Sequence, residues 1–226
     1  TLTNAINRTA SAGGDPSSRL SIDVADIEVV ETEARTRSAV ALLVDTSYSM
    51  AAEGRWVPMK RTALALHHLV STRFRGDRLQ LIGFGRHAQA MDIAELTGLP
   101  PLREQGTNLH HALMLATRFF RSLPTMQPVL LIVTDGEPTA HLSTGGESFF
   151  SWPPDPYTIS LTVAELDRLA RMAARTTFFR LGDDPGLARF IGQMADRVGG
   201  RVVAPDAGEL GAAVVDEYLH ARYRDW

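Results

Sequence analysis

Cysteine is absent from the 226 residues of this chain, which excludes disulfide bonds, cysteine-ligated zinc and thiol nucleophiles. The absence fits a reducing compartment, so we expect a cytoplasmic protein. An excess of positive charge is also missing, because 23 Lys and Arg are set against 26 Asp and Glu, leaving a net charge of −3. Nucleic-acid-binding proteins typically carry a basic patch, so we expect no nucleic-acid partner.

Long apolar runs are missing as well. No stretch reaches the roughly 20 apolar residues of a membrane-spanning helix, and no charged-then-apolar leader opens the chain, so we expect no membrane insertion. Hydrophobic residues make up 44% of the chain and charged residues 22%, a composition typical of a folded globular domain. Since the first residue is Thr1 rather than Met, we expect this chain to be a piece of a longer protein.

The first 37 residues differ from the rest of the chain. Residues 1–20 are polar, small and rich in Gly and Ser, which is typical of a linker or arm. Short alternating pieces at 22–24 and 27–29 indicate strand-like structure, and a charged connector follows them. We therefore expect an N-terminal arm and lead-in segment over residues 1–37 and one domain over residues 38–226.

From residue 38 onward, apolar runs of strand length alternate with segments of helical periodicity. Continuous apolar strands are expected where helices cover both faces of a parallel sheet. The succession predicts an α/β fold with an open, doubly wound sheet, and residues 87–93 are a candidate edge strand. The expected strands are 39–44, 79–84, 129–134, 177–181 and 202–204, and the expected helices are 56–74, 108–122, 163–174, 185–198 and 207–223.

Polar side chains gather where ligands of such sheets bind, beyond the carboxyl ends of the strands. Asp45, Ser47 and Ser49 follow the first expected strand. Asp135 follows the third strand, and Thr107 lies just before the second helix. Hard divalent cations take oxygen ligands, and a calcium cage usually recruits more carboxylates and carbonyls than these. The set favours Mg²⁺ or Mn²⁺ with an open coordination position, with Ca²⁺ as an alternative.

The run D-T-S-Y-S, from Asp45 to Ser49, resembles the D-x-S-x-S motif of the von Willebrand factor A (VWA) family. Thr107 and Asp135 match the other two elements of its metal-ion-dependent adhesion site (MIDAS). The resemblance covers roughly residues 38–222. It implies a Rossmann-like, mostly parallel sheet with one antiparallel edge strand, and an Mg²⁺-type ion on these residues. The family usually has Gly where this chain has Tyr48, which is not a ligand position but places an aromatic ring beside the ion.

The resemblance also implies a function, that of a protein–protein interaction module. An Asp or Glu of the partner would complete the coordination of the ion. The charged lead-in before the first strand and the D-T-S-Y-S-M loop are similar to bacterial intracellular VWA proteins related to the magnesium-chelatase D subunit. Because these proteins work with MoxR-type AAA+ ATPases, we expect such an ATPase, or its client, as the partner.

Three alternatives stay open. Asp45 could simply cap the following helix, since Asp and Ser are good N-cap residues. The same pocket could serve a Mg²⁺-dependent hydrolase, although the sequence has neither G-x-S-x-G nor a phosphate-binding P-loop. Ser47 also stands where D-x-D-x-T hydrolases have their second aspartate, so we expect no catalytic activity. An extracellular adhesion domain is the third alternative.

The seven histidines include two adjacent pairs, His67-His68 and His110-His111. Neighbouring side chains on a helix point about 100° apart, so neither pair can easily chelate one ion. The H-E-x-x-H spacing of zinc proteases is absent from the sequence. We therefore expect these histidines to have structural roles.

Residues 139–160 predict an unusually long loop that starts just after Asp135. It contains Phe149, Phe150, Trp152 and Tyr157, and it should lie over the proposed metal edge. Domain cores and interface cores are enriched in the same aromatic residues, so the loop is either a lid packed on its own domain or a partner-binding rim.

Overall fold

The computed structural model describes residues 2–101 and 103–223 apart from 12–36, and the chain divides into two units, Thr1–Arg35 and Thr36–Trp226. In the first unit, Leu2–Ser11 forms helix α1, in which the Thr9 hydroxyl donates to the Ala5 carbonyl at 2.8 Å. The sequence analysis expects an arm over residues 1–37, and these ten residues of it are helical. The strand-like pieces expected at 22–24 and 27–29 lie outside the described residues.

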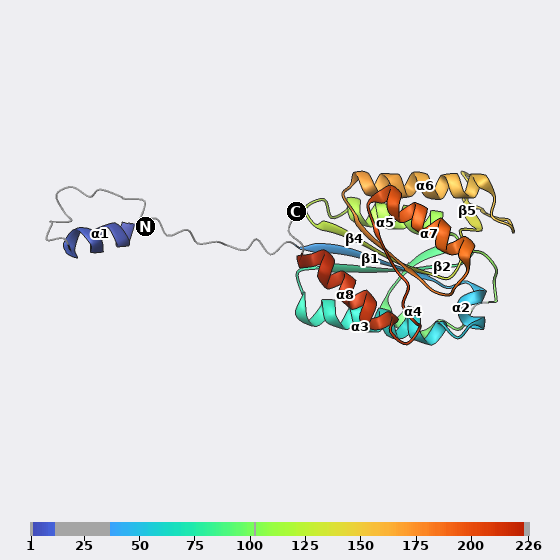
Figure 1. Cartoon of the computed structure of the whole chain (residues 1–226), viewed down its shortest axis with the longest axis horizontal. Coiled ribbons are helices and arrows are strands. Elements are labelled where there is room, and N and C mark those ends of the chain that lie inside the picture. The colour runs from blue at the N-terminus through green and yellow to red at the C-terminus, as the bar shows by residue number, and fades with distance from the viewer. Residues whose placement is uncertain (1, 12–36, 102, 224–226) are drawn as a thin grey trace. The chain divides into compact units, whose positions relative to one another are not determined.

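The second unit is built on a six-stranded sheet with strand order β3-β2-β1-β4-β7-β8 (Figure 1). All neighbouring strands are parallel except β2 and β3, so the α/β fold with one antiparallel edge strand is confirmed. In the register of the sheet, Leu42 of β1 lies opposite Leu81 of β2 and Leu131 of β4. The strands are β1 (Ser38–Asp45), β2 (Arg78–Phe84), β3 (Ala88–Met91), β4 (Gln127–Thr134), β7 (Arg175–Arg180) and β8 (Arg201–Val203).

Helices cover both faces of this sheet, and the alternation of side chains along β1 assigns the two cores. Ala41 and Leu43 pack with the helices of one face, whereas Val40 and Leu42 pack with those of the other. On the first face lie α5 (Leu109–Arg121), α6 (Pro156–Arg171) and α7 (Pro185–Val198). On the second lie α2 (Tyr48–Ala52), α3 (Trp56–Arg73), α4 (Ile93–Gly98) and α8 (Leu210–Tyr223).

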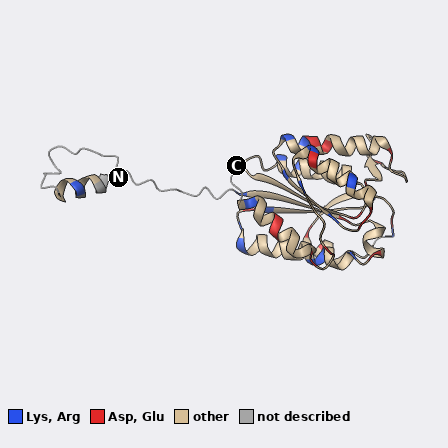
Figure 2. Ribbon diagram, in the orientation of Figure 1, with Lys and Arg blue, Asp and Glu red and all other residues tan. Residues whose placement is uncertain are grey.

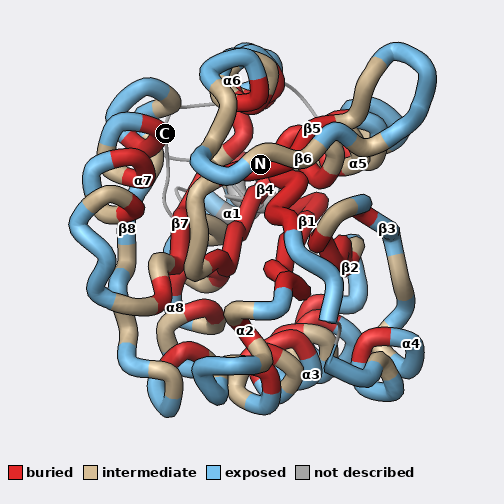
Figure 3. Tube along the Cα trace, turned by 90° about the vertical axis from the view of Figure 1, so that its right-hand side faces the viewer, coloured by how far each residue is buried: buried red, intermediate tan, exposed pale blue. Residues whose placement is uncertain are grey.

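The distribution of buried and charged residues follows from this layering. Every residue of β1 is buried, as expected for a central strand covered on both faces, and Figure 3 shows buried residues along β1 and β4. Charged residues of both signs lie mainly on the helices and loops, whereas the central strands carry almost none (Figure 2). Within the described residues, no helix combines the length and the apolar character needed to cross a membrane.

Half of the segment predicted as a long loop, 11 of its 22 residues, is regular structure. Residues Ala140–Leu142 (β5) pair antiparallel with Ser148–Phe150 (β6) as a separate hairpin. Helix α6 begins at Pro156, not at 163, with the Asp155 carboxylate accepting from the Tyr157 amide at 2.7 Å. The sequence hides this start because the first turns of α6 bury Thr158 and Thr162 in place of apolar side chains.

A buried carboxylate connects the C-terminal helix to the start of the central strand. Asp77 Oδ2 accepts from the Tyr218 hydroxyl at 2.7 Å and from Arg222 Nε at 3.0 Å. Its Oδ1 accepts from the Ser38 amide at 3.1 Å. Burial and the Asp77 charge both raise the pKa of Tyr218, so its hydroxyl is a donor throughout the physiological range. Asp77 thus joins α8 to β1.

Replacing Tyr218 with Phe removes one donor to this buried carboxylate and leaves the aromatic packing in place. We expect the free energy of unfolding to fall by about 1–3 kcal/mol, measured by urea denaturation. Tyr223→Phe is the matched control, since Tyr223 is largely exposed, and it should change stability little. Equal effects of the two variants would contradict the role given to the Asp77 contacts.

Candidate functional site

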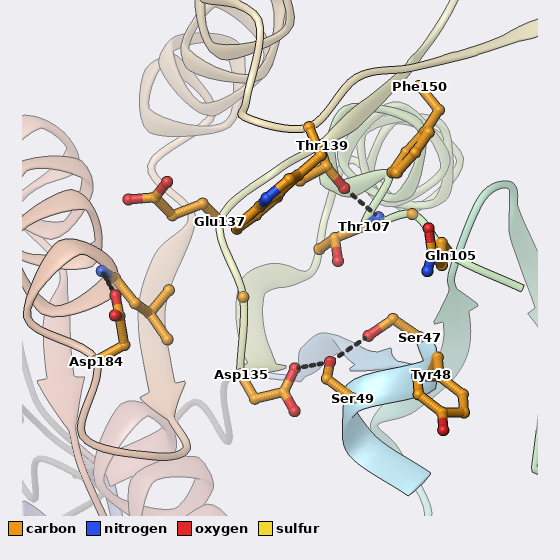
Figure 4. A pocket seen from close by; sticks show the side chains of 14 residues that line it. Ser47, Tyr48, Ser49, Gln105, Thr107, Asp135, Glu137, Thr139, Phe150 and Asp184 are labelled. Carbon is orange, nitrogen blue, oxygen red and sulfur yellow. Dashed lines mark hydrogen bonds between the residues drawn. The ribbon is translucent and has the colours of Figure 1, made fainter. Parts of the chain in front are cut away.

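The five predicted ligand residues come together at the carboxyl edge of the sheet, which Figure 3 views face-on. Ser47 and Ser49 lie at the start of α2, and their hydroxyl oxygens are 3.1 Å apart. The Ser49 hydroxyl donates to Asp135 Oδ1 at 2.8 Å, so three of the residues form a continuous chain of hydrogen bonds (Figure 4). The Thr107 side chain faces the same space from the segment before α5.

Asp45 lies behind this chain as the last residue of β1. It is fully buried, with Oδ1 accepting from the Ser47 amide at 2.9 Å and Oδ2 from the Thr134 hydroxyl at 2.7 Å. Burial, reinforced by the charge of Asp135, raises the pKa of Asp45 to about 7. The protein's own groups therefore do not fully stabilise the ionised form of Asp45.

The segment that follows β1 leads directly into a short helix. Residues 45–49 do not form an extended loop, because α2 begins at Tyr48 and places Ser49 in its first turn. Ser47 is the N-cap residue, yet its side chain makes no capping hydrogen bond. The Asp45 carboxylate accepts from the amide of the N-cap residue Ser47 and not from an amide of the first helical turn, so Asp45 does not cap α2. The Ser47 hydroxyl is thereby left to face Ser49.

Asp135 has a second partner that sequence reasoning missed. Arg55, in the link between α2 and α3, donates from Nη1 to Asp135 Oδ2 at 2.8 Å. Burial raises the pKa of Asp135, while the bonds from Ser49 and Arg55 oppose that shift. No motif marks Arg55, since its partner lies eighty positions further along the chain.

A cavity of about 440 Å³ lies at this edge of the sheet, within the size range of ligand-binding pockets. Four of the five predicted ligand residues are among its lining residues, namely Ser47, Ser49, Thr107 and Asp135 (Figure 4). Several lining residues carry no recognisable sequence signal, because separate loops bring them in. They are Gln105, Gly106, Gly136, Glu137, Thr139, Asp184 and Leu187.

Three aromatic side chains also line the cavity. Tyr48, Phe150 and Trp152 line it, and Trp152 is 74% exposed. Phe149 and Tyr157 instead surround His141, with ring centroids 4.9 and 5.4 Å away. Of the four aromatic residues in the 139–160 segment, Phe150 and Trp152 thus line the cavity, whereas Phe149 and Tyr157 pack against His141 of the hairpin.

Hydrogen bonds between Thr107 and Thr139 connect the hairpin to the site. The Thr107 amide donates to the Thr139 hydroxyl at 2.9 Å, and the Thr107 carbonyl accepts from the Thr139 amide at 3.1 Å. Gly106 has a φ of +132°, and a Cβ there would lie 3.3 Å from the Arg86 Cα, so a glycine is needed beside Thr107. This geometry places Thr107 between α5 and the hairpin.

The histidines of this region accept hydrogen bonds and hold structure, as the sequence predicts. His110 Nδ1 accepts from the Leu142 amide at 3.3 Å, and His111 Nδ1 accepts from the Ala88 amide at 3.1 Å. Among the residues that the structure describes, no three His, Asp or Glu side chains are grouped to hold a metal ion. The candidate site is of another type, combining two carboxylates with three hydroxyls.

Comparison with known families agrees with the fold. A family model described as "Rv0959-like protein, vWA domain" matches residues 38–219. The chain belongs to this vWA family. Domains of the vWA class are commonly involved in protein–protein interaction and in metal-dependent adhesion.

This vWA chain has relatives in mycobacteria. The uncharacterized protein Rv0959 of Mycobacterium tuberculosis H37Rv and its counterpart in Mycobacterium bovis are each 61% identical to it over 228 residues. The match covers 99% of this chain and 34% of each relative, so the chain spans about a third of their length.

Solved structures share the fold at low sequence identity. The von Willebrand factor type A protein from Catenulispora acidiphila has a TM-score of 0.64 at 15% identity, covering 84% of this chain and 44% of that one. A mutant of the PilB minor pilin from Streptococcus sanguinis has a TM-score of 0.65 at 14% identity, covering 85% and 63%. Proximal thread matrix protein 1 from the mussel byssus, with a zinc-occupied MIDAS motif, has a TM-score of 0.57 at 14% identity, covering 81% and 47%.

Burial near the site makes stability depend on pH. It lowers the pKa of His110 to about 4, below the roughly 6.5 of an unfolded histidine. Protonation therefore favours the unfolded chain, so the stability due to neutral His110 is complete above pH 6.5 and is lost as the pH falls toward 4. We expect His110→Gln to reduce this loss by up to about 2 kcal/mol, measured by urea denaturation from pH 7 to 4.5.

The control for this experiment is His68→Gln, because His68 is exposed on α3. Asp45 and Asp135 titrate in the opposite sense, since their raised pKa values favour folding as the pH falls, but they are common to all three proteins. A pH profile of His110→Gln parallel to that of the parent protein would contradict the prediction.

Proposed function

We propose that this vWA domain is a metal-dependent protein-interaction module with a MIDAS. The ion would be held by Asp45, Ser47, Ser49, Thr107 and Asp135. The observation that carries the proposal is the Ser47–Ser49–Asp135 chain of hydrogen bonds, which brings oxygens from two distant segments to one cavity.

The donor set fits a hard divalent cation. Its ligand atoms are carboxylate and hydroxyl oxygens, which suit Mg²⁺, Mn²⁺ or Ca²⁺ better than softer metals. A cation would also compensate Asp45, which is buried with a raised pKa near a second carboxylate. We propose Mg²⁺ as the resident ion. The zinc-occupied MIDAS of the mussel protein makes Zn²⁺ a useful comparison in binding experiments.

An ion held by these five residues would have an open coordination position. An oxygen atom of a partner could bind there. A carboxylate of the partner, from Asp or Glu, provides both a hard oxygen and the opposite charge. The similarity of the D-T-S-Y-S-M loop and the charged lead-in to chelatase-type proteins supports a MoxR-type AAA+ ATPase, or its client, as this partner. Such a partner would place the domain in the cytoplasm.

We propose binding rather than catalysis at this site. In the described structure, the Ser47 and Ser49 hydroxyls bond to each other and to Asp135, and neither bonds to a histidine base. A serine nucleophile normally needs such a base within hydrogen-bond reach. The competing hydrolase function predicts Mg²⁺-dependent turnover of generic phosphoesters or nucleotides by the purified chain, and our proposal predicts none.

Asp45→Asn tests the ion site, since it removes one negative charge and keeps the side-chain size. Mg²⁺ should raise the melting temperature of the parent protein by mass action, and chelation by EDTA should reverse the shift without unfolding the sheet. We expect the Asn variant to lose this response and to bind Mg²⁺ at least about 100-fold more weakly by calorimetry. Thr107→Val removes a neutral ligand and should weaken binding less, by about tenfold.

Asp183→Asn is the matched control, because Asp183 is an exposed carboxylate in the loop before α7. It should keep both the Mg²⁺ affinity and the Mg²⁺-dependent capture of a MoxR-type ATPase from the same organism. If Asp45→Asn captures that ATPase with unchanged affinity, the ion is not part of recognition and the proposal fails. Unfolding on addition of EDTA would show instead that the ion is structural.

Trp152 tests the contribution of the cavity rim. Because its side chain is 74% exposed and lines the cavity, Trp152→Ser should leave the melting temperature nearly unchanged. It should weaken partner capture about tenfold or more, as expected for an aromatic anchor at an interface. Tyr157→Ser is the control, since Tyr157 is 61% exposed but does not line the cavity. Equal losses of capture in both variants would contradict a specific role of the rim.

A further inference from the structure

Arg55 places a guanidinium directly on one of the two candidate ligand carboxylates. Its Nη1 lies 2.8 Å from Asp135 Oδ2, while Oδ1 of the same carboxylate accepts from Ser49. The Asp135 side chain is fully buried and the Arg55 side chain is only 15% exposed. Charges shielded from solvent interact more strongly than charges at the surface, so the effect of Arg55 on this site is larger than that of an ordinary surface cation.

The fold positions both the backbone and the guanidinium of Arg55. Its amide donates to the Met50 carbonyl at 2.9 Å, and its carbonyl accepts from the Met59 amide at 3.0 Å at the start of α3. The guanidinium lies against Gly182, in the loop after β7, where an added Cβ would stand 2.6 Å from Nη2. Gly182 has a φ of +85°, a conformation that favours glycine. That loop therefore leaves room for the guanidinium.

The charge balance of the site follows from these contacts. Ionised Asp45 and Asp135 supply two negative charges, and Arg55 cancels one of them. Glu53 pairs with the other side of the guanidinium, but its side chain is 55% exposed and solvent screens its charge. With a divalent ion bound, the site would therefore carry one net positive charge. One carboxylate of a partner would neutralise it.

We propose that Arg55 is a positioning residue that holds Asp135 and lowers the affinity of the site for a divalent cation. The cation is then bound firmly only when an acidic ligand completes the site. This inference rests on the proposed metal site and deepens it, because it gives a physical reason for the partner to be acidic. It makes ion binding and partner binding mutually reinforcing.

The experiment compares Mn²⁺ uptake by the parent chain and by Arg55→Gln, with free Mn²⁺ counted by electron paramagnetic resonance. Gln removes the positive charge and keeps a donor, so we expect about tenfold tighter uptake. Arg55→Lys keeps the charge, and Arg61→Gln removes an exposed charge on α3. Both variants should stay within about twofold of the parent. Acetate, as a carboxylate probe matched with chloride for ionic strength, should tighten uptake more in the parent than in Arg55→Gln.

Circular dichroism establishes that each variant is folded, and Arg55→Met replaces the Gln variant if that one is not. Unchanged or weaker uptake by a folded, charge-free variant, with clear uptake by the parent, overturns the inference and leaves the proposed function standing. Uptake by the variant alone supports the inference and overturns ion-dependent function in the parent chain. Absence of uptake by both proteins overturns both proposals.

Discussion

The parallel pairing of β1 with β4 is the constraint on which the candidate site depends. The two strands are neighbours in the centre of the sheet, and β1 also pairs with β2 on its other side, so the strand order reverses between β1 and β4. Their register brings Asp45 and Asp135 to the same edge, where the Thr134 hydroxyl bonds to Asp45. Open α/β sheets bind ligands at such reversal points because the following loops separate there.

Much of this arrangement could be predicted from the sequence. Continuous apolar runs indicate strands that are buried on both faces, which is why β1 and β4 fall close to their expected positions. The same reasoning places the oxygen donors at strand ends, and the structure brings Ser47, Ser49 and Asp135 into contact. That these residues hold an ion stays a prediction.

The rest could not be predicted, because it depends on contacts that leave no periodic pattern. The start of α6 buries threonines that satisfy their hydroxyls within the helix and against His141. The hairpin β5–β6 is too short to produce an alternating signal, so its residues look like a loop. Arg55 meets Asp135 and Gly182 only after three distant loops converge, and a single sequence does not show that convergence.

The attachment of the hairpin has a mechanical consequence. The Ser151 amide donates to the Thr139 carbonyl at 3.0 Å, and Thr139 is bonded in turn to both backbone groups of Thr107. A pulling force applied at Trp152 would therefore reach the first turn of α5 through a short series of hydrogen bonds. Trp152 and Thr107 are therefore connected mechanically, and a load on either residue would be shared through Thr139.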